Sequence, residues 1–335
     1  MATHRKAVAL CLIVFALSVG SSGVSWGQVQ TLTTFYTAPV VSMAPMWIAK
    51  ELGFFKKQGL DVRVVFIPSG PTGTTAILAG EADVGVIGGF APIRAILGGA
   101  KSLAIIGETK NAIVATIVGK KEIATVQDLK GKRLGIDRIG SNPDMFTQAA
   151  LARFQMDPLR DLQYIQMGDI GQGVPALKAG AIDALTTNPP YDLLAQRLGF
   201  KMILDITAMK IPFAATVLVS NRNTMARKQP ELTKFMHAYA EAVHYFITNR
   251  EGAVQVVAKY TKVEDRELLN YSIDTDAKAV QRTLEVDPKG IELVLGLISK
   301  SVPQAASAKP EDFYDARFFT ELKDSGFLKR LWGEN

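Results

Sequence analysis

Glycine, hydroxyl and amide residues follow several β-rich runs of this 335-residue chain, and their types suit ligand binding. Glycine leaves backbone N–H groups accessible, and Ser, Thr, Asn and Gln side chains add hydrogen-bond donors, so such loops bind anions and other polar groups. Lys110 and Arg138 could add charge, and Tyr191 a ring that orients a ligand. The candidate ligand-binding residues are Thr37, Ser42, Met43, Ser69, Thr72, Gly73, Gly88, Gly89, Lys110, Arg138, Gly140, Ser141, Asn142, Gln172, Asn188 and Tyr191.

Patterns that would indicate catalysis or a metal site are weak. Residues 135–141, Gly-Ile-Asp-Arg-Ile-Gly-Ser, resemble a phosphate-binding loop but lack the lysine that precedes its final Ser or Thr. His237 and His244 lie two helical turns apart, about 10 Å along the axis, which is too far for one zinc ion without other ligands. No Gly-x-Ser-x-Gly or HExxH motif occurs in residues 28–335. We therefore predict no enzyme activity, no metal and no cofactor.

A pattern that occurs twice, about 100 residues apart, positions the candidate residues. In each copy a strand, a helix, a second strand, a polar loop, a short helix and a third strand follow one another. The short helices end in similar phrases, Gly80-Glu81-Ala82-Asp83 and Gly180-Ala181-Ile182-Asp183, although Gly-x-x-Asp alone is also an ordinary helix stop before a strand. The predicted strands cover residues 31–36, 62–67 and 84–87 in one copy and 133–137, 162–167 and 184–187 in the other.

Alternating strands and helices with short loops predict two α/β lobes, each with a parallel sheet covered by helices. Loops beyond the carboxyl ends of parallel strands line ligand crevices, and most of the candidate residues occupy such loops. Two lobes that face each other along these edges enclose one cleft. Gly140-Ser141-Asn142 suits helix N-capping and anion capture equally, because a helix is predicted from Pro143. A bulky residue at Gly73 or Gly88 is expected to abolish binding and leave the fold intact.

The segment after residue 220 is largely helical and is predicted to act as a scaffold. Long helices fit residues 230–248, 251–260 and 291–300, where apolar residues recur at helical spacing. We expect Phe235, Tyr239 and Phe246 to pack as core.

The first 27 residues are typical of a cleaved export signal. His4, Arg5 and Lys6 form a basic start, residues 7–19 an apolar core, and Ser-Trp-Gly at 25–27 a small-x-small cleavage site. A helix over the apolar core would span about 20 Å, short of the ~30 Å hydrocarbon layer, so a membrane anchor is disfavoured. We predict cleavage near Gly27 and a periplasmic protein.

Composition narrows the function classes further. The single cysteine, Cys11, lies in the export segment, so the mature chain has no disulfide and no thiolate metal site. Cleavage lowers the formal charge from +6 to +4, because two basic residues and no acidic residue are removed. The basic pairs are scattered along the chain, which disfavours nucleic-acid binding.

Residues 45–62, Pro-Met-Trp-Ile-Ala-Lys-Glu-Leu-Gly-Phe-Phe-Lys-Lys-Gln-Gly-Leu-Asp-Val, resemble the opening helix and second strand of a known family. These are periplasmic solute-binding proteins of the sulfonate, nitrate and taurine type, grouped with the thiamine-pyrimidine precursor proteins. Residues 79–85 and 128–135 look like further landmarks of the same group. The resemblance covers most of residues 31–270, and it is specific for the family but not for the ligand.

The resemblance implies a type II periplasmic-binding-protein fold, with two α/β lobes, a cleft, two hinge crossings and a helical C-terminal tail. Lobe one is expected to comprise residues 28–112 and 214–335, and lobe two residues 113–213, with hinges near 109–115 and 210–214. A ligand that touches both lobes would stabilise the closed form.

The function that the resemblance implies is that of a monomer that captures a small anionic or heteroaromatic organic molecule and delivers it to the membrane permease of an ABC transporter. One alternative is a periplasmic sensing subunit for a membrane receptor. A thiamine-pyrimidine enzyme is a second alternative, but the cysteine-rich iron motif of fungal relatives is absent from this sequence.

Overall fold

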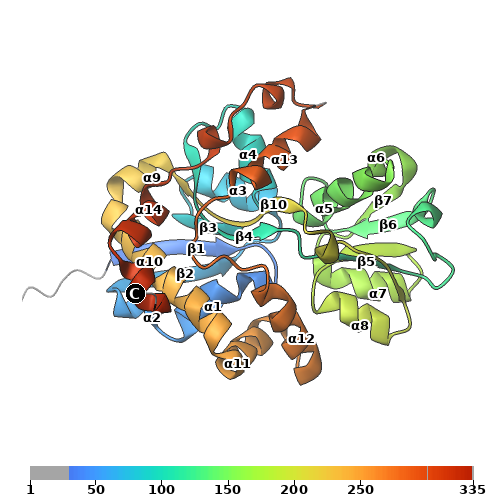
Figure 1. The fold of residues 1–335 in the computed structure, drawn as a ribbon, viewed down its shortest axis with the longest axis horizontal. Coiled ribbons are helices and arrows are strands. Elements are labelled where there is room, and N and C mark those ends of the chain that lie inside the picture. Colours follow the sequence, from blue (N-terminus) through green and yellow to red (C-terminus); the bar gives the residue numbers. More distant parts are fainter. Residues whose placement is uncertain (1–29, 300, 334–335) are drawn as a thin grey trace, which may run out of the picture.

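The computed structural model describes residues 30–299 and 301–333, so the proposed cleavage site near Gly27 lies outside the described residues. Figure 1 shows two α/β lobes side by side, with the helices of the C-terminal segment gathered around the first lobe. None of the helices within the described residues has the length and apolar composition needed to span a membrane.

The sheet of lobe one has the strand order β2-β1-β3-β10-β4. Its first three strands are parallel to one another, and β10 runs antiparallel to both β3 and β4. The strands are β1 (Gln30–Tyr36), β2 (Leu60–Phe66), β3 (Val84–Ile87), β4 (Leu103–Ala112) and β10 (Pro212–Asn221). Strand β10 therefore returns from the second lobe to complete the sheet of the first.

The sheet of lobe two repeats this plan with the order β7-β6-β8-β5-β9. Its strands are β5 (Thr116–Gly119), β6 (Arg133–Ile136), β7 (Gln163–Gln166), β8 (Ala184–Thr187) and β9 (Lys201–Asp205). Strands β6, β7 and β8 are parallel, and β5 is antiparallel to β8 and β9. Two lobes of similar plan are thus confirmed. Strands β4, β5 and β9 were not predicted, nor was the antiparallel direction of β10, whose strand was expected at residues 215–220.

Helices cover both sheets, and the C-terminal segment is helical as expected. Lobe one contains α1 (Ala44–Glu51), α2 (Phe54–Lys57), α3 (Gly70–Leu78) and α4 (Phe90–Leu97). Lobe two contains α5 (Asn142–Leu151), α6 (Pro158–Asp161), α7 (Gly173–Lys178) and α8 (Tyr191–Arg197). The C-terminal helices are α9 (Arg222–Arg227), α10 (Gln229–Thr248), α11 (Arg250–Thr261), α12 (Arg266–Ala277), α13 (Pro288–Ile298), α14 (Arg317–Asp324) and α15 (Phe327–Trp332). The expected core residues Phe235, Tyr239 and Phe246 are buried in α10.

The repeated Gly-x-x-Asp phrase has the same structural role in both lobes. Gly80 and Gly180 follow α3 and α7 with positive φ values of 76° and 71°, a conformation that glycine adopts at little cost where a helix ends. Three residues later, Asp83 accepts a hydrogen bond from the backbone N–H of Thr33, and Asp183 accepts one from that of Arg133. Each carboxylate thereby ties the start of the third strand to the strand beside it.

Two neighbouring segments connect the lobes. Residues 113–115 link β4 to β5, and residues 206–211 link β9 to β10. The two segments run side by side, since the N–H of Ile113 donates to the carbonyl of Ile211 at 3.1 Å. Phe146 of α5 packs edge-on against Phe213 of β10, with ring centroids 5.2 Å apart, so apolar packing continues across the hinge. The predicted lobe boundaries and hinge motion stay predictions.

Candidate functional site

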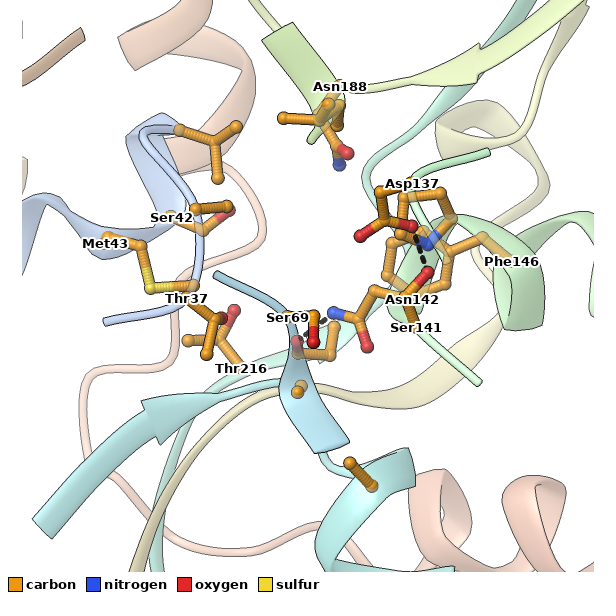
Figure 2. A pocket seen from close by; sticks show the side chains of 18 of the residues that line it. Thr37, Ser42, Met43, Ser69, Asp137, Ser141, Asn142, Phe146, Asn188 and Thr216 are labelled. Carbon is orange, nitrogen blue, oxygen red and sulfur yellow. Dashed lines mark hydrogen bonds between the residues drawn. The ribbon is translucent and has the colours of Figure 1, made fainter. Parts of the chain in front are cut away.

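A cleft between the two lobes is the candidate site. It encloses about 800 Å³ of empty space, counting solvent at its open mouth. Loops after β1, β2 and β3 line it from lobe one, and loops after β6, β7 and β8 line it from lobe two. Figure 2 shows Ser42 and Thr37 on one side of the cavity and Asp137 and Ser141 on the other. The carboxyl ends of the parallel strands thus face each other, as expected.

The structure places ten of the sixteen predicted site residues in the lining of this cleft. They are Thr37, Ser42, Met43, Ser69, Gly88, Lys110, Gly140, Ser141, Asn142 and Asn188. The other six lie outside the lining: Thr72, Gly73, Gly89, Arg138, Gln172 and Tyr191. Contact of any of them with a ligand stays a prediction.

Local packing explains why several predicted residues lie outside the lining. Thr72, Arg138 and Gln172 are exposed at the surface. A Cβ atom at Gly73 would overlap the ring of Phe35, and one at Gly89 would overlap Ala214. The expectation that a bulky residue at Gly73 leaves the fold intact is therefore wrong, because this glycine makes room for a core aromatic ring.

Gly88 has a different neighbour, in the opposite lobe. A Cβ atom on Gly88 would overlap the side-chain amide of Asn142, which belongs to α5. The Nδ2 of Asn142 donates to the carbonyl of Ala215 in β10 at 2.8 Å. The two lobes are therefore in contact across the cleft, and the lack of a side chain at Gly88 permits this approach.

The lobe-one wall presents hydroxyl groups and a strained turn. Ser69 precedes α3 with a φ of 75°, which is rare for a residue other than glycine. Its hydroxyl lies 3.2 Å from that of Thr72. Strain of this kind concentrates at functional sites, and Ser69 lines the cleft.

Lys110 lies at the base of the cleft, but its charge is already paired. The ammonium donates to Asp276 Oδ1 at 2.5 Å and to the hydroxyl of Ser42 at 2.9 Å. The Lys110 and Asp276 side chains are 2% and 3% exposed. Such a buried pair depends on its own partners, because separating the charges would leave one uncompensated. The structure thus does not place a free ammonium in the cleft.

The amino end of α5 forms the opposite wall. Ser141 precedes this helix but makes no capping hydrogen bond to it, and its hydroxyl donates to the carboxylate of Asp137 instead. Asp144, in the first turn, accepts a hydrogen bond from the N–H of Gly140 at 2.8 Å. Capping by the Ser141 side chain is therefore excluded, and capture of an anion stays a prediction.

Two carboxylates that were not predicted from the sequence, Asp137 and Asp169, also line the cleft. Burial raises the pKa of Asp137 to about 6. Asp169 accepts a hydrogen bond from the N–H of Gly171 at 2.6 Å. The signal for Asp137 was present in the sequence, since it ends the predicted strand 133–137 and carboxyl ends of strands face the crevice.

Further contacts join the lobes beside the cleft. Arg197, at the end of α8, forms ion pairs with Asp265 and Glu267 at the start of α12. The hydroxyl of Tyr271 in α12 donates to Asp192 in α8 at 2.9 Å. These contacts hold the lobes together on the side where α8 and α12 meet (Figure 1).

Comparison with known proteins identifies the family. The family model described as NMT1/THI5 like matches residues 41–253, which is more than half of the chain. This chain belongs to the NMT1/THI5-like family. The resemblance noted in residues 45–62 is thereby confirmed, and the match includes most of lobe one's parallel strands and all of lobe two.

Two relatives are similar to this chain over most of their length. A binding protein of Brucella abortus (strain 2308) is 28% identical over 283 residues, covering 82% of this chain and 86% of the relative. A protein of Brachyspira hyodysenteriae named as an ABC transporter periplasmic binding protein is 24% identical, covering 75% of this chain and 76% of the relative.

A solved structure supports the fold assignment. The alkanesulfonate-binding protein SsuA from Xanthomonas axonopodis pv. citri bound to MOPS superposes with a TM-score of 0.70 and 20% identity. The match covers 84% of this chain and 95% of that protein. The expected periplasmic-binding-protein fold, with two α/β lobes and a helical C-terminal segment, is thus confirmed for this member of the NMT1/THI5-like family.

Proposed function

We propose that this chain is an exported, monomeric solute-binding protein that holds a small organic molecule between its lobes and delivers it to the permease of an ABC importer. The observation that carries the proposal is the cleft itself, which both sheets line with their strand ends. A ligand bound there would touch both lobes and so stabilise their closed arrangement over an open one. Closure would be the signal that the importer recognises.

The relatives support the transport role and the location. A Brachyspira hyodysenteriae relative is named as a periplasmic binding protein of an ABC transporter, and SsuA binds alkanesulfonates. The basic and apolar residues before Gln28 support export with cleavage near Gly27. The two ligand classes expected from the sequence, anionic and heteroaromatic, are the candidates for this cleft.

Ligand-dependent stabilisation of residues 28–335 tests the cleft. A thermal-shift screen would include organic sulfonates, nitrate, aromatic acids and pyrimidines, and calorimetry would measure the affinity of each compound that responds. A ligand that binds only the folded protein raises its stability by about 2.7 kcal/mol at 100-fold excess over Kd. Recovery of the ligand unchanged would distinguish binding from catalysis.

A matched pair of glycine variants shows whether binding uses the cleft. Gly88→Ala would keep Asn142 from its place and hinder closure, so we expect at least tenfold weaker binding with an unchanged fold. Gly296→Ala in α13 adds the same methyl group where no atom lies within 4 Å, and its affinity should match that of the unmodified protein. Equal affinities in all three proteins would rule out the cleft as the binding site.

Delivery to an importer is tested in cells. Deleting the gene for this chain should abolish high-affinity uptake of the identified ligand, and the unmodified gene should restore it. Normal uptake in the deletion strain, together with loss of a ligand-dependent change in gene expression, would favour the sensing role over transport.

A further inference from the structure

Among the charged side chains that line the cleft, negative charges outnumber positive charges. Among the described residues they are Lys110, Asp137 and Asp169. Lys110 is already paired with Asp276, which is almost completely buried behind it. The remaining charges that face the ligand space are therefore two carboxylates, both from lobe two.

Only one of the two carboxylate oxygens of Asp137 accepts hydrogen bonds from described protein groups. Its Oδ1 accepts hydrogen bonds from the hydroxyl of Ser141 and from the N–H of Arg138, the latter at 2.8 Å. No described protein group donates a hydrogen bond to Oδ2, and Figure 2 shows this second oxygen directed into the cavity. A ligand that fills the cleft would displace water from this oxygen, so the ligand would have to supply a donor or a positive charge in return.

No basic side chain supplies that positive charge. Arg138, the next residue, is exposed and lies outside the cleft lining. The nearby charge on Asp144 is negative, and it adds to the effect of burial in raising the pKa of Asp137. The environment of the free oxygen thus suits a ligand atom that donates a hydrogen bond.

We infer that the ligand presents a protonated nitrogen or an N–H group, as in an amidine, an amine or an amino-substituted heterocycle, to Asp137 of lobe two. This inference rests on the proposed function and narrows its ligand class. Asp169, on the same wall, disfavours a ligand whose only charged group is negative and lies toward lobe two, since like charges in a desolvated site repel. Any anionic group of the ligand would face the hydroxyl groups of lobe one, where Thr37, Ser42 and Ser69 lie.

Matched probe compounds test the inference. Benzamidine is a cation, benzoate and benzenesulfonate are anions with the same ring, and 4-aminopyrimidine differs from pyrimidine by its N–H donors. We expect benzamidine and 4-aminopyrimidine to stabilise residues 28–335 in thermal shift and calorimetry. Their affinities should exceed those of the anions and of pyrimidine by at least tenfold.

Two variants separate Asp137 from a general effect of charge. Asp137→Asn should weaken binding of benzamidine at least tenfold, whereas Asp61→Asn, which removes an exposed carboxylate on β2, should leave it unchanged. Asp137→Glu keeps the charge and should retain part of the affinity. Circular dichroism would show whether Asp137→Asn folds. If it does not, the test is the affinity of Asp137→Glu for benzamidine, which should be lower than that of the unmodified protein.

The outcomes distinguish this inference from the proposed function. Tight binding of the anions that is sensitive to Gly88→Ala but not to Asp137→Asn would overturn the inference and leave the binding function standing. An absence of response to all five probes and to the wider ligand screen would contradict both. Benzamidine binding that depends on Asp137 but not on Gly88 would retain the inference and contradict closure.

Discussion

Glu108 is a buried carboxyl group in the middle of β4, beside the hinge. It is 0% exposed, and its Oε2 accepts a hydrogen bond from the N–H of Asp287 at 2.7 Å. Its Oε1 has no hydrogen-bond partner among the described residues. Burial raises the pKa of Glu108 to about 9, with the charge of Asp287 as a smaller cause. The side chain is therefore protonated in the folded protein at neutral pH.

Replacing Glu108 should remove a pH dependence of stability. The folded-state pKa lies above the ordinary value of 4.5, so the folded protein holds a proton that the unfolded chain releases between about pH 4.5 and 9. The unfolding free energy should fall through this range, by at most about 1.4 kcal/mol per pH unit. Glu108→Gln should flatten this fall and be more stable than the unmodified protein at pH 8.

Denaturant unfolding at pH 5, 6, 7 and 8 measures this difference. The exposed carboxyl group of Glu122 provides the control, because Glu122→Gln should leave the pH profile unchanged. A Glu108→Gln profile parallel to that of the unmodified protein would show that Glu108 is ionised in the fold.

At the scale of elements, the Gly-x-x-Asp turns join neighbouring strands in both lobes. In lobe two, Asp183 also pairs with Arg133 at 2.8 Å and Lys120 at 2.6 Å, whereas in lobe one Asp83 pairs with Lys228. Hydrogen bonds from Arg133 first, and from Lys120, lower the pKa of Asp183. The turn of lobe two therefore depends more strongly on its carboxylate charge.

Asp183→Asn should destabilise the protein at neutral pH. The folded-state pKa of Asp183 is below its ordinary value of 3.8, so its charge contributes stability above about pH 4, and this contribution is lost as the pH falls further. The variant should unfold at a lower denaturant concentration at pH 7, and the gap should narrow below pH 4. Asp61→Asn, at an exposed carboxylate without an ion pair in the described structure, should unfold like the unmodified protein at both pH values.

The sequence predicted the parallel strands well because their β-branched runs and flanking glycines are local signals. Residues 84–87 and 184–187 form strands with the predicted bounds. Strand β4 was missed because Glu108, Thr109 and Lys110 interrupt its apolar pattern. Each of the three makes a hydrogen bond to a residue that is distant in sequence. Lys110 shows what local sequence signals cannot reveal. Its position in the cleft lining was predicted, but its ion-pair partner Asp276 lies in α12, a helix that was not predicted.

Site residues could be predicted where a loop follows a strand. They could not be predicted where packing between elements determines whether a residue lines the cleft or is buried in the core. Ser42, Ser69 and Asn188 line the cleft by the strand-end rule. Gly73 follows the same rule in sequence, yet it packs under Phe35, a contact between elements that spacing does not reveal. Asp137 was not predicted because the glycine and hydroxyl residues of the neighbouring loops suit an anionic ligand, which a carboxylate would repel.

At the scale of the whole molecule, we expect contacts between α8 and α12 to favour a closed arrangement of the lobes over an open one. The ion pairs of Arg197 with Asp265 and Glu267 join the two lobes and would be broken by opening. Exposed ion pairs contribute little individually, but any contact made only in the closed form shifts the equilibrium toward it.

Arg197→Ala should therefore shift the free protein toward open forms and weaken ligand binding by about two- to fivefold. Small-angle scattering should show a larger radius of gyration without ligand, and calorimetry gives the affinity. Arg160→Ala is the control, because Arg160 pairs with Asp161 within α6 and crosses no lobe boundary. An Arg197→Ala protein with the scattering curve and affinity of the control would contradict a role for these pairs in closure.

In the proposed closing motion, the backbone at Gly88 would limit how far the two lobes approach each other. Asn142 would then meet main-chain atoms rather than a side chain that could change its rotamer, so the protein and not its ligand would set the width of the closed cleft. Molecules of different bulk would then produce either the same shut form or none. A transporter that docks on the outer faces would encounter one invariant shape, and could accept every cargo without sensing which one is inside.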